Sequence, residues 1–478
     1  MENCESGDGR REQVKVPLLK TYGTLKNDDI WTESKMLWRI VGPTIFTRVA
    51  SYSLNIVTQS FAGRLGNLEL ASISLSITVI LGFNFGLPLG MASALETLCG
   101  QAYGAKQYRM LGIYLQCSWV VLFLCAVLLL PVYIFTSPIL KLLGQPDDLA
   151  EQSGLVTIWL IPVHFAFAFQ LPLQRYLQCQ FKTPITAYIS WCVLAFHVFV
   201  NWLFLYKLSF GIIGAAVTMN ISWWIIVLAL FCYVVCGGCP DTWTGFSMEA
   251  FSGLWEFFKL SAASGVMLCL ENWYYRILIL MTGNLNNATI AVSALAVCMG
   301  INEWEMSIPL AFFSATGVRV ANELGAGNGK AAKFASIISA ITSLIIGLCI
   351  CLLIMNFHGK LATIFTSSNI VIQEVDKLAM LLAITIFLNS IQPLISISTQ
   401  SIRGSRWFRM ASICGCYYVV GLPLGAVLGW FFHLGVQGIW SGMIGGTAIQ
   451  TLILVIITIS CDWDMQVEKA SLRMTAKK

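Results

Sequence analysis

Charged residues are scarce in this sequence. Asp, Glu, Lys and Arg make up 11% of its 478 residues, whereas 57% of the residues are hydrophobic. Soluble domains carry about 25% charged residues, so the composition indicates an integral membrane protein. The net charge of +5 is small and the basic residues form no clustered face, so binding to nucleic acid is not expected.

Residues that build metal centres and catalytic sites are also few. The four histidines lie far apart, and the sixteen cysteines are scattered through apolar segments, where cysteine acts as a small apolar filler. The CxxC pair Cys236 and Cys239 has neither a second pair nor a nearby histidine. Residues 327–330 (GNGK) lack the spacing of a phosphate-binding loop. We therefore expect no metal, no cofactor and no enzymatic activity.

Long apolar segments dominate the chain instead. Twelve of them have about the 20 residues that one helix needs to cross a bilayer. In chain order they cover residues 36–60, 68–95, 111–135, 153–174, 186–206, 210–236, 257–282, 289–318, 335–356, 374–400, 410–432 and 434–459. The expected fold is an all-α integral membrane protein with twelve transmembrane helices.

The predicted domains follow from these segments. Residues 1–35 and 460–478 are tails, residues 36–236 form a first lobe with spans one to six, residues 237–256 are a linker, and residues 257–459 form a second lobe. An even number of spans places both termini on one side. The basic residues assigned to loops on that side are Lys106, Arg109, Arg175, Lys182, Arg319, Lys330, Lys333, Arg403, Arg406 and Arg409. The opposite loops carry fewer, so the positive-inside rule predicts cytosolic termini.

The two predicted lobes resemble each other in sequence. Residues 65–75 match residues 285–295, and residues 210–214 match residues 434–438, both at an offset of about 220 positions. Because each repeat would contain six spans, the repeats are parallel and related by an axis along the membrane normal. We expect two pseudo-symmetric six-helix lobes with a cleft between them, an architecture suited to alternating access.

Ionisable residues inside the apolar segments mark the candidate functional site. Glu271 lies ~20 Å along the helix from Phe257, near the middle of the hydrocarbon. An ionisable side chain there costs at least ~2.5 kcal/mol, so it should face a cavity or a partner. Glu305 and Asn389 are expected at a similar depth and can share one cavity with Glu271. A carboxyl group that gains and loses a proton can favour different helix packings, whereas a structural glutamate paired within the bundle is the alternative.

Two glutamates of the eighth span are candidates for facing the cavity. Glu303 and Glu305 are two residues apart, roughly 200° around a helix, so both cannot face one cavity. We favour Glu305, because Pro309 four residues later shares its face and permits local bending. Glu303 is then nearer the outer surface or in a structural ion pair.

Four further residues are candidates for lining a substrate cavity. Arg48 is a fixed cation in the first lobe that either attracts anionic substrates or has a structural role. Tyr275 and Trp304 offer aromatic rings that stack on planar organic compounds, although aromatic residues in helices more often serve packing. Gln392 is a polar residue at the depth of Asn389.

Several motifs resemble those of plant multidrug and toxic compound extrusion (MATE) transporters. Residues 94–105 (ALETLCGQAYGA) and 318–328 (VRVANELGAGN) are similar to the signatures of the two lobes, and residues 63–66 (GRLG) and 417–425 (YYVVGLPLG) also match. The resemblance covers about residues 31–463. It is nearest to the plant DETOXIFICATION branch that includes vacuolar flavonoid transporters.

The resemblance implies a two-lobe, twelve-helix fold and export of organic compounds in exchange for protons. It also implies that Glu271 occupies the position of the span-seven glutamate linked to proton coupling. Many members of the family carry an aspartate in span ten where this chain has Asn389. The asparagine removes one titratable partner, so either Glu305 replaces that carboxylate or Glu271 acts alone with Asn389 as its hydrogen-bond partner.

We therefore expect a proton-coupled antiporter that moves organic cations, flavonoid-type metabolites or xenobiotics out of the cytosol. The alternatives are a sodium-coupled exchanger and a lipid-handling flippase of the same superfamily. The expected partners are a small organic substrate, protons and the lipid bilayer, and the expected state is a monomer. The sequence leaves open which substrate is carried and whether the protein resides in the vacuolar or the plasma membrane.

Overall fold

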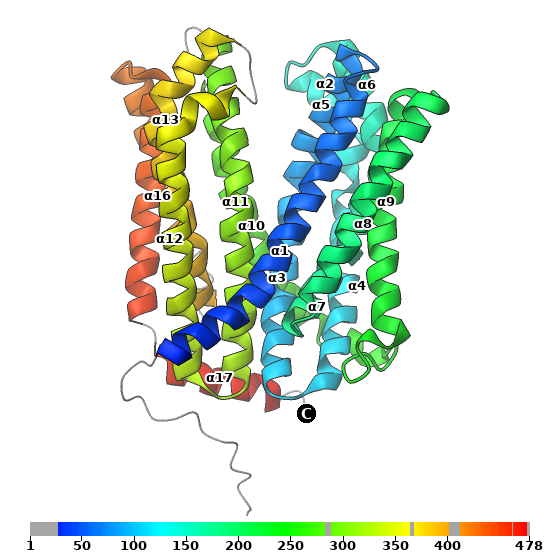
Figure 1. Ribbon diagram of the computed structural model, residues 1–478, viewed down its shortest axis with the longest axis vertical. Coiled ribbons are helices and arrows are strands. Elements are labelled where there is room, and N and C mark those ends of the chain that lie inside the picture. Colours follow the sequence, from blue (N-terminus) through cyan, green and yellow to red (C-terminus); the bar gives the residue numbers. More distant parts are fainter. Residues whose placement is uncertain (1–26, 283–287, 364–367, 401–411, 461, 476–478) are drawn as a thin grey trace, which may run out of the picture.

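The computed structural model describes residues 27–282, 288–363, 368–400, 412–460 and 462–475. Within these ranges the regular elements are helices (Figure 1). The first half contains α1 (Asn27–Ala62), α2 (Asn67–Leu75), η1 (Ser76–Leu81), α3 (Gly82–Gly104), α4 (Tyr108–Ile134), α5 (Thr136–Leu142), α6 (Asp147–Trp159), α7 (Ile161–Cys179), α8 (Thr183–Asn201), η2 (Trp202–Lys207), α9 (Gly211–Tyr233), η3 (Val234–Gly238) and η4 (Met248–Phe251). The second half contains α10 (Leu254–Thr282), α11 (Ala288–Gly325), α12 (Gly329–Ala362), α13 (Asn369–Gln400), η5 (Cys414–Gly421), α15 (Leu422–Ala426), η6 (Val427–Phe431), α16 (Gly435–Ile459) and α17 (Trp463–Thr475).

The long helices account for the expected membrane crossings. Among the described residues, seven helices are long and apolar enough to cross a membrane, or eight if the bent pair α6 and α7 counts as one span. Four more long helices, α1, α10, α11 and α13, have 36, 29, 38 and 32 residues. These four carry Arg48, Glu271, Glu305 and Asn389 respectively. These four helices, which bring the number of crossings to the expected twelve, are therefore the ones that carry the polar candidate residues.

Two lobes are visible in the arrangement of the helices (Figure 1). In the first lobe α3 packs against α4 and α7, and in the second lobe α11 packs against α12 and α13 in the same way. The turns before α9 and α16 also repeat: Ser209 and Gly211 have φ of 52° and 59°, and His433 and Gly435, 224 positions later (433 − 209), have φ of 56° and 58°. The predicted repeat is therefore present in the backbone.

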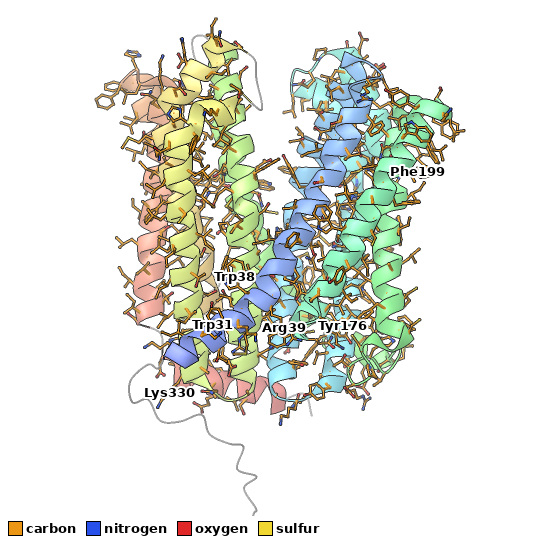
Figure 2. All side chains as sticks on the ribbon, viewed as in Figure 1. Trp31, Trp38, Arg39, Tyr176, Phe199 and Lys330 are labelled. Carbon is orange, nitrogen blue, oxygen red and sulfur yellow. The ribbon has the colours of Figure 1, made fainter. Side chains whose placement is uncertain are left out.

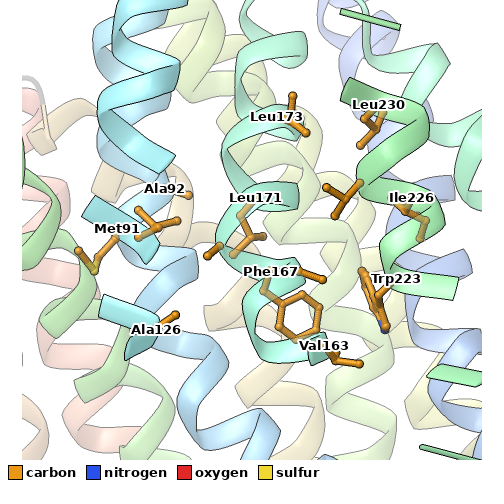
Figure 3. Packing of buried hydrophobic residues seen from close by; sticks show 14 of the residues in the cluster. Met91, Ala92, Ala126, Val163, Phe167, Leu171, Leu173, Trp223, Ile226 and Leu230 are labelled. Atoms are coloured by element: carbon orange, nitrogen blue, oxygen red, sulfur yellow. The ribbon is translucent and has the colours of Figure 1, made fainter. Parts of the chain in front are cut away.

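Close side-chain packing holds the first lobe together. Figure 3 shows Phe167 and Leu171 of α7 between the residues of α3 and those of α9. The rings of Phe167 and Trp223 meet edge to face, with centroids 4.7 Å apart. Because lipid tails are as apolar as leucine, such helices associate through van der Waals packing and interhelical hydrogen bonds rather than through the hydrophobic effect.

The lobes contact each other on the side that carries the start of α1 and helix α17, which we call the terminal side (Figure 1). There α3 packs against α10 and α11, whereas the ribbons of the two lobes diverge towards the opposite side (Figure 1). Small residues permit this crossing: a Cβ on Gly104 would lie 1.9 Å from the Asn322 carbonyl oxygen, and one on Gly325 would lie 2.0 Å from that of Gln101. The two backbones are in direct contact.

Two predicted boundaries need correction. The first helix begins at Asn27, so residues 27–35 belong to α1 and not to a tail, because Glu33 is buried in an ion pair with Arg319. The fourth predicted span consists of α6 and α7, which meet at an angle of 46°. Pro162 stands in the first turn of α7. Its missing N–H is tolerated there, because the first N–H groups of a helix have no partner within the helix, so α7 begins as a new helix at this point.

Two basic residues assigned to loops are also corrected. Arg175 lies in α7 and Arg319 in α11, and each is at most 5% exposed. Both stand near the end of a helix, where apolar patterning fades, and both are paired with glutamates. The positive-inside count therefore loses these two residues from the loops.

The linker and the end of the chain make more contacts with the helices than their polar composition predicted. In the segment 237–256 the Thr242 hydroxyl lies 2.7 Å from the Tyr176 hydroxyl, and Arg109 Nη2 lies 2.5 Å from Glu249 Oε1. The linker is therefore docked on the first lobe. Within residues 460–478, α17 buries Trp463 in a cluster with residues of α11 and α12.

Candidate functional site

Helix α10 presents two different faces near its centre. Glu271 and Tyr275 are four residues apart and share one face. On another face Trp273 stacks on Phe83 of α3, with ring centroids 4.9 Å apart and planes 6° from parallel. A Cβ on Gly86 of α3 would lie 3.2 Å from the Asn272 side-chain nitrogen. Asn272 and Trp273 therefore contact the first lobe, which leaves Glu271 and Tyr275 on the side of the second lobe.

A hydrogen-bonded chain connects three helices of the second lobe. The Tyr275 hydroxyl of α10 donates to Asn389 Oδ1 of α13 at 3.0 Å. Asn389 Nδ2 in turn donates to Asn302 Oδ1 of α11 at 3.1 Å. Asn389 is 2% exposed and Asn302 is 6% exposed. Both ends of the Asn389 amide are thus engaged, so this side chain fixes the relative position of α10, α11 and α13.

Glu305 lies beside these hydrogen bonds and is 6% exposed. Among the described residues neither of its carboxyl oxygens has a hydrogen-bond partner. The Ser390 hydroxyl interacts with Glu305, but it donates to the Ile386 carbonyl oxygen at 2.8 Å. The hydroxyl of Tyr275 lies within electrostatic reach of both Glu271 and Glu305. A proton on Glu305 would turn one of its oxygens into a hydrogen-bond donor.

Glu303 has a different environment. It is exposed, and it interacts electrostatically with Tyr52 of α1. Trp304 is 57% exposed and meets the Tyr52 ring edge to face at 6.2 Å. Glu303 and Trp304 are therefore directed towards the first lobe, whereas Glu305 is directed into the second.

A small pocket adjoins the chain of hydrogen bonds. It lies between α10, α13 and α16 and is lined by Tyr274, Tyr275, Leu278, Thr385, Leu388, Trp440, Met443, Ile444 and Thr447. Its volume of about 10 Å³ admits roughly one water molecule, so in this conformation it does not hold an organic compound. Tyr274 closes one wall: its hydroxyl donates to the Met443 carbonyl oxygen at 2.8 Å, and its ring stacks on Tyr417 at 4.2 Å.

The structure separates Arg48 and Trp304 from this cluster. Arg48 lies in the first lobe, where its charged neighbours are Arg175 and Glu96. Trp304 contacts Tyr52 at the border between the lobes. Gln392 falls in the part of α13 whose side chains lie outside the described residues. The cluster thus joins Glu271, Glu305, Asn389 and Tyr275, and the other three predicted residues lie elsewhere or are not described.

Sequence reasoning missed three residues with notable contacts. Asn302 stands three residues before Glu305 and therefore shares its helix face, a signal that was available. Glu96 follows the predicted end of the second span, and Arg175 follows the predicted end of the fourth. Their side chains form a buried ion pair, Arg175 Nη1 to Glu96 Oε2 at 2.7 Å, which only the fold brings together.

Comparisons with known proteins agree with this architecture. The family model described as MatE matches residues 43–203 and 263–427. Protein DETOXIFICATION 27 of Arabidopsis thaliana is 59% identical over 478 residues, covering 98% of each chain. Protein DETOXIFICATION 26 from the same plant is 55% identical, covering 99% of this chain and 98% of its own.

A solved structure is similar along nearly the whole chain. The crystal structure of the eukaryotic MATE transporter AtDTX14 superposes with a TM-score of 0.88 at 31% identity, covering 93% of this chain and 99% of that one. With twelve helices in two lobes, matching motifs in both lobes and relatives identical at more than half of their positions, the chain belongs to the MATE family of membrane transporters.

Proposed function

We propose that this chain is a proton-coupled antiporter that exports organic compounds from the cytosol by alternating access, with Glu271 as the group that carries the proton. The observation that supports the proposal is the cluster around Tyr275. Two carboxyl groups, Glu271 and Glu305, lie within electrostatic reach of one phenol, and that phenol donates to Asn389. Asn389 cannot titrate, so proton exchange in this cluster falls on the glutamates.

The helices that carry the cluster can link protonation to movement. Glu271 and Tyr275 share α10 with Asn272 and Trp273, which contact α3 of the first lobe. A change of charge at Glu271 alters the face of α10 that packs in the second lobe. The same helix forms part of the contact between lobes, so proton uptake can favour one arrangement of the lobes over the other.

Direction and substrate class complete the proposal. We place both termini in the cytosol, because Lys106, Arg109, Lys182, Lys330 and Lys333 flank helix ends on the terminal side. The far side is then the vacuole or the cell exterior. We propose organic cations, xenobiotics or flavonoid-type metabolites as substrates, in line with the names of the DETOXIFICATION relatives.

Transport by purified protein in liposomes tests this proposal. Proteoliposomes with an acidic interior are placed in sodium-free choline buffer at higher pH, and uptake of a fluorescent planar organic cation is followed. We expect uptake that a protonophore abolishes. Uptake that requires sodium at constant pH would favour a sodium-coupled exchanger, and lipid movement without a gradient and without cation uptake would favour a flippase.

A further inference from the structure

A buried polar cluster connects the first lobe to α11 near the terminal side. Glu96 of α3 and Arg175 of α7 form the ion pair described above, and both side chains are 5% exposed. Arg175 Nη1 also donates to Gln178 Oε1 at 3.1 Å and makes a short hydrogen bond to Ser314 Oγ of α11. The Ser314 hydroxyl has Gln178 Oε1 at 3.0 Å and Glu96 Oε2 at 3.4 Å as acceptors. Ser314 is therefore the point where the second lobe enters a charged cluster of the first.

A second ion pair joins the lobes closer to the chain termini. Arg319, just over one helical turn after Ser314 on α11, donates from Nε and Nη2 to the two carboxyl oxygens of Glu33 on α1, each at 2.9 Å. Arg319 Nη2 also lies 2.8 Å from Glu323 Oε1 on its own helix. The parallel two-bond geometry is the strong arrangement for an arginine and a carboxylate. Because Glu33 is 7% and Arg319 5% exposed, water screens this pair only weakly.

Helix α1 is shaped to reach this contact. Its first turns lie against the second lobe on the terminal side and its later turns against the first lobe (Figure 1). Trp38, labelled in Figure 2, meets the Phe312 ring of α11 edge to face at 5.6 Å. The segment of α1 around Glu33 and Trp38 thus lies across α11, although most of α1 packs with α8 of the first lobe.

We propose that these two contacts are latches that hold the terminal side closed. The inner latch is Ser314 with Arg175 and Glu96, and the outer latch is Arg319 with Glu33. Both hold α11 to the first lobe, and both have to break before the terminal side opens, a step that rests on the proposed alternating access. Charged groups suit this role because water solvates them once the lobes part, whereas separated apolar surfaces would gain no such compensation.

A native cysteine reports on the closed terminal side. Cys179, at the end of α7, is 0% exposed, and its carbonyl oxygen accepts a hydrogen bond from Asn322 Nδ2 of α11 at 3.4 Å. The Cys179 thiol donates to the Glu96 carbonyl oxygen of α3 at 3.4 Å, beside Arg175 and Glu96 of the inner latch. When α11 leaves the first lobe, water reaches the inner latch and, with it, this thiol. Its labelling by a membrane-impermeant maleimide, measured in nanodiscs by peptide-resolved mass spectrometry, therefore reports the opening. The measurement needs neither substrate nor a proton gradient, so its outcome is independent of the transport assay.

Two variants each remove one latch. Glu33→Gln keeps the size of the side chain and removes the charge paired with Arg319. Ser314→Ala removes the link to α11 and leaves Arg175 and Glu96 paired within the first lobe. We expect each to speed Cys179 labelling about tenfold, because each removes hydrogen bonds to charged groups that only the closed arrangement makes. The charge exchange Glu33→Arg with Arg319→Glu is expected to return labelling close to the wild-type rate.

A control variant and the opposite outcomes complete the test. Glu249→Gln breaks the ion pair with Arg109, which joins the linker to the first lobe on the terminal side and does not touch α11. It should leave the labelling of Cys179 unchanged. Unchanged labelling in monodisperse Glu33→Gln and Ser314→Ala proteins would overturn the proposal. So would equal acceleration by Glu249→Gln, and a charge exchange that stays as fast as Glu33→Gln would overturn the outer latch.

Discussion

Replacing Gly104 with alanine should force α3 and α11 apart on the terminal side. The new Cβ would lie 1.9 Å from the Asn322 carbonyl oxygen, and ordinary contacts begin at 3.4 Å, so the two backbones have to separate by about 1.5 Å (3.4 − 1.9). No rotation of a side chain relieves the overlap, because the opposing atom belongs to the backbone. Overpacking of this kind costs roughly 1–3 kcal/mol.

The cost applies to the closed arrangement and disappears when the lobes part. A difference of 1–3 kcal/mol corresponds to roughly 5-fold to 150-fold in the ratio of open to closed molecules. Cys179 labelling measures that ratio, and the melting temperature of the purified protein reports any loss of overall stability. We expect faster labelling and a lower melting temperature for Gly104→Ala.

Gly42→Ala is the matched control. Gly42 lies inside α1, and a Cβ placed there would meet nothing within 4 Å. Alanine favours a helix over glycine by up to about 1 kcal/mol, so this variant should keep or raise the melting temperature and leave labelling unchanged. If Gly104→Ala behaves like Gly42→Ala in both measurements, then the direct backbone contact between α3 and α11 does not govern the closed state.

Two further predictions concern buried polar contacts. Arg175→Met leaves the Glu96 carboxylate buried without its cation, so thermal unfolding should show a loss of roughly 3–5 kcal/mol, and adding Glu96→Gln should recover most of it; no recovery would contradict the ion pair. Tyr275→Phe removes the donor to Asn389 Oδ1, which should cost about 1–3 kcal/mol and slow proton-driven uptake without changing Cys179 labelling; unaltered uptake would argue against a role in coupling.

Hydropathy and turn residues predicted much of the fold. Apolar length alone indicated the helices, and the repeated glycine turns at 211 and 435 indicated the two lobes. The bend between α6 and α7 was harder to predict, because Pro162 is compatible with either a kinked helix or a new one. The start of α1 at Asn27 could not be read from hydropathy, since residues 27–35 are polar and gain their helical structure from contacts such as that of Glu33 with Arg319.

The candidate site was likewise predictable from the sequence only in part. Helix spacing separated Glu305 from Glu303, and the structure has the first buried and the second exposed. The partners of the interlobe contacts could not be predicted from the sequence, because Glu33 and Arg319 are 286 positions apart and no local pattern links them. Pairing also hides such residues from hydropathy analysis, because a paired charge can be buried at the end of a helix where an isolated charge would indicate a loop.

The central claim is that Glu271 carries the coupled proton, and one transport measurement tests it most directly. Uptake of an organic cation into acid-loaded proteoliposomes is compared for the wild type, Glu271→Gln and the control Glu249→Gln, at equal incorporation and in sodium-free buffer. The glutamine keeps the size of the side chain but cannot exchange a proton. We expect Glu271→Gln to lose the uptake driven by the pH gradient while Glu249→Gln retains it. If the gradient still drives uptake by Glu271→Gln at the wild-type rate, Glu271 is not the coupling group.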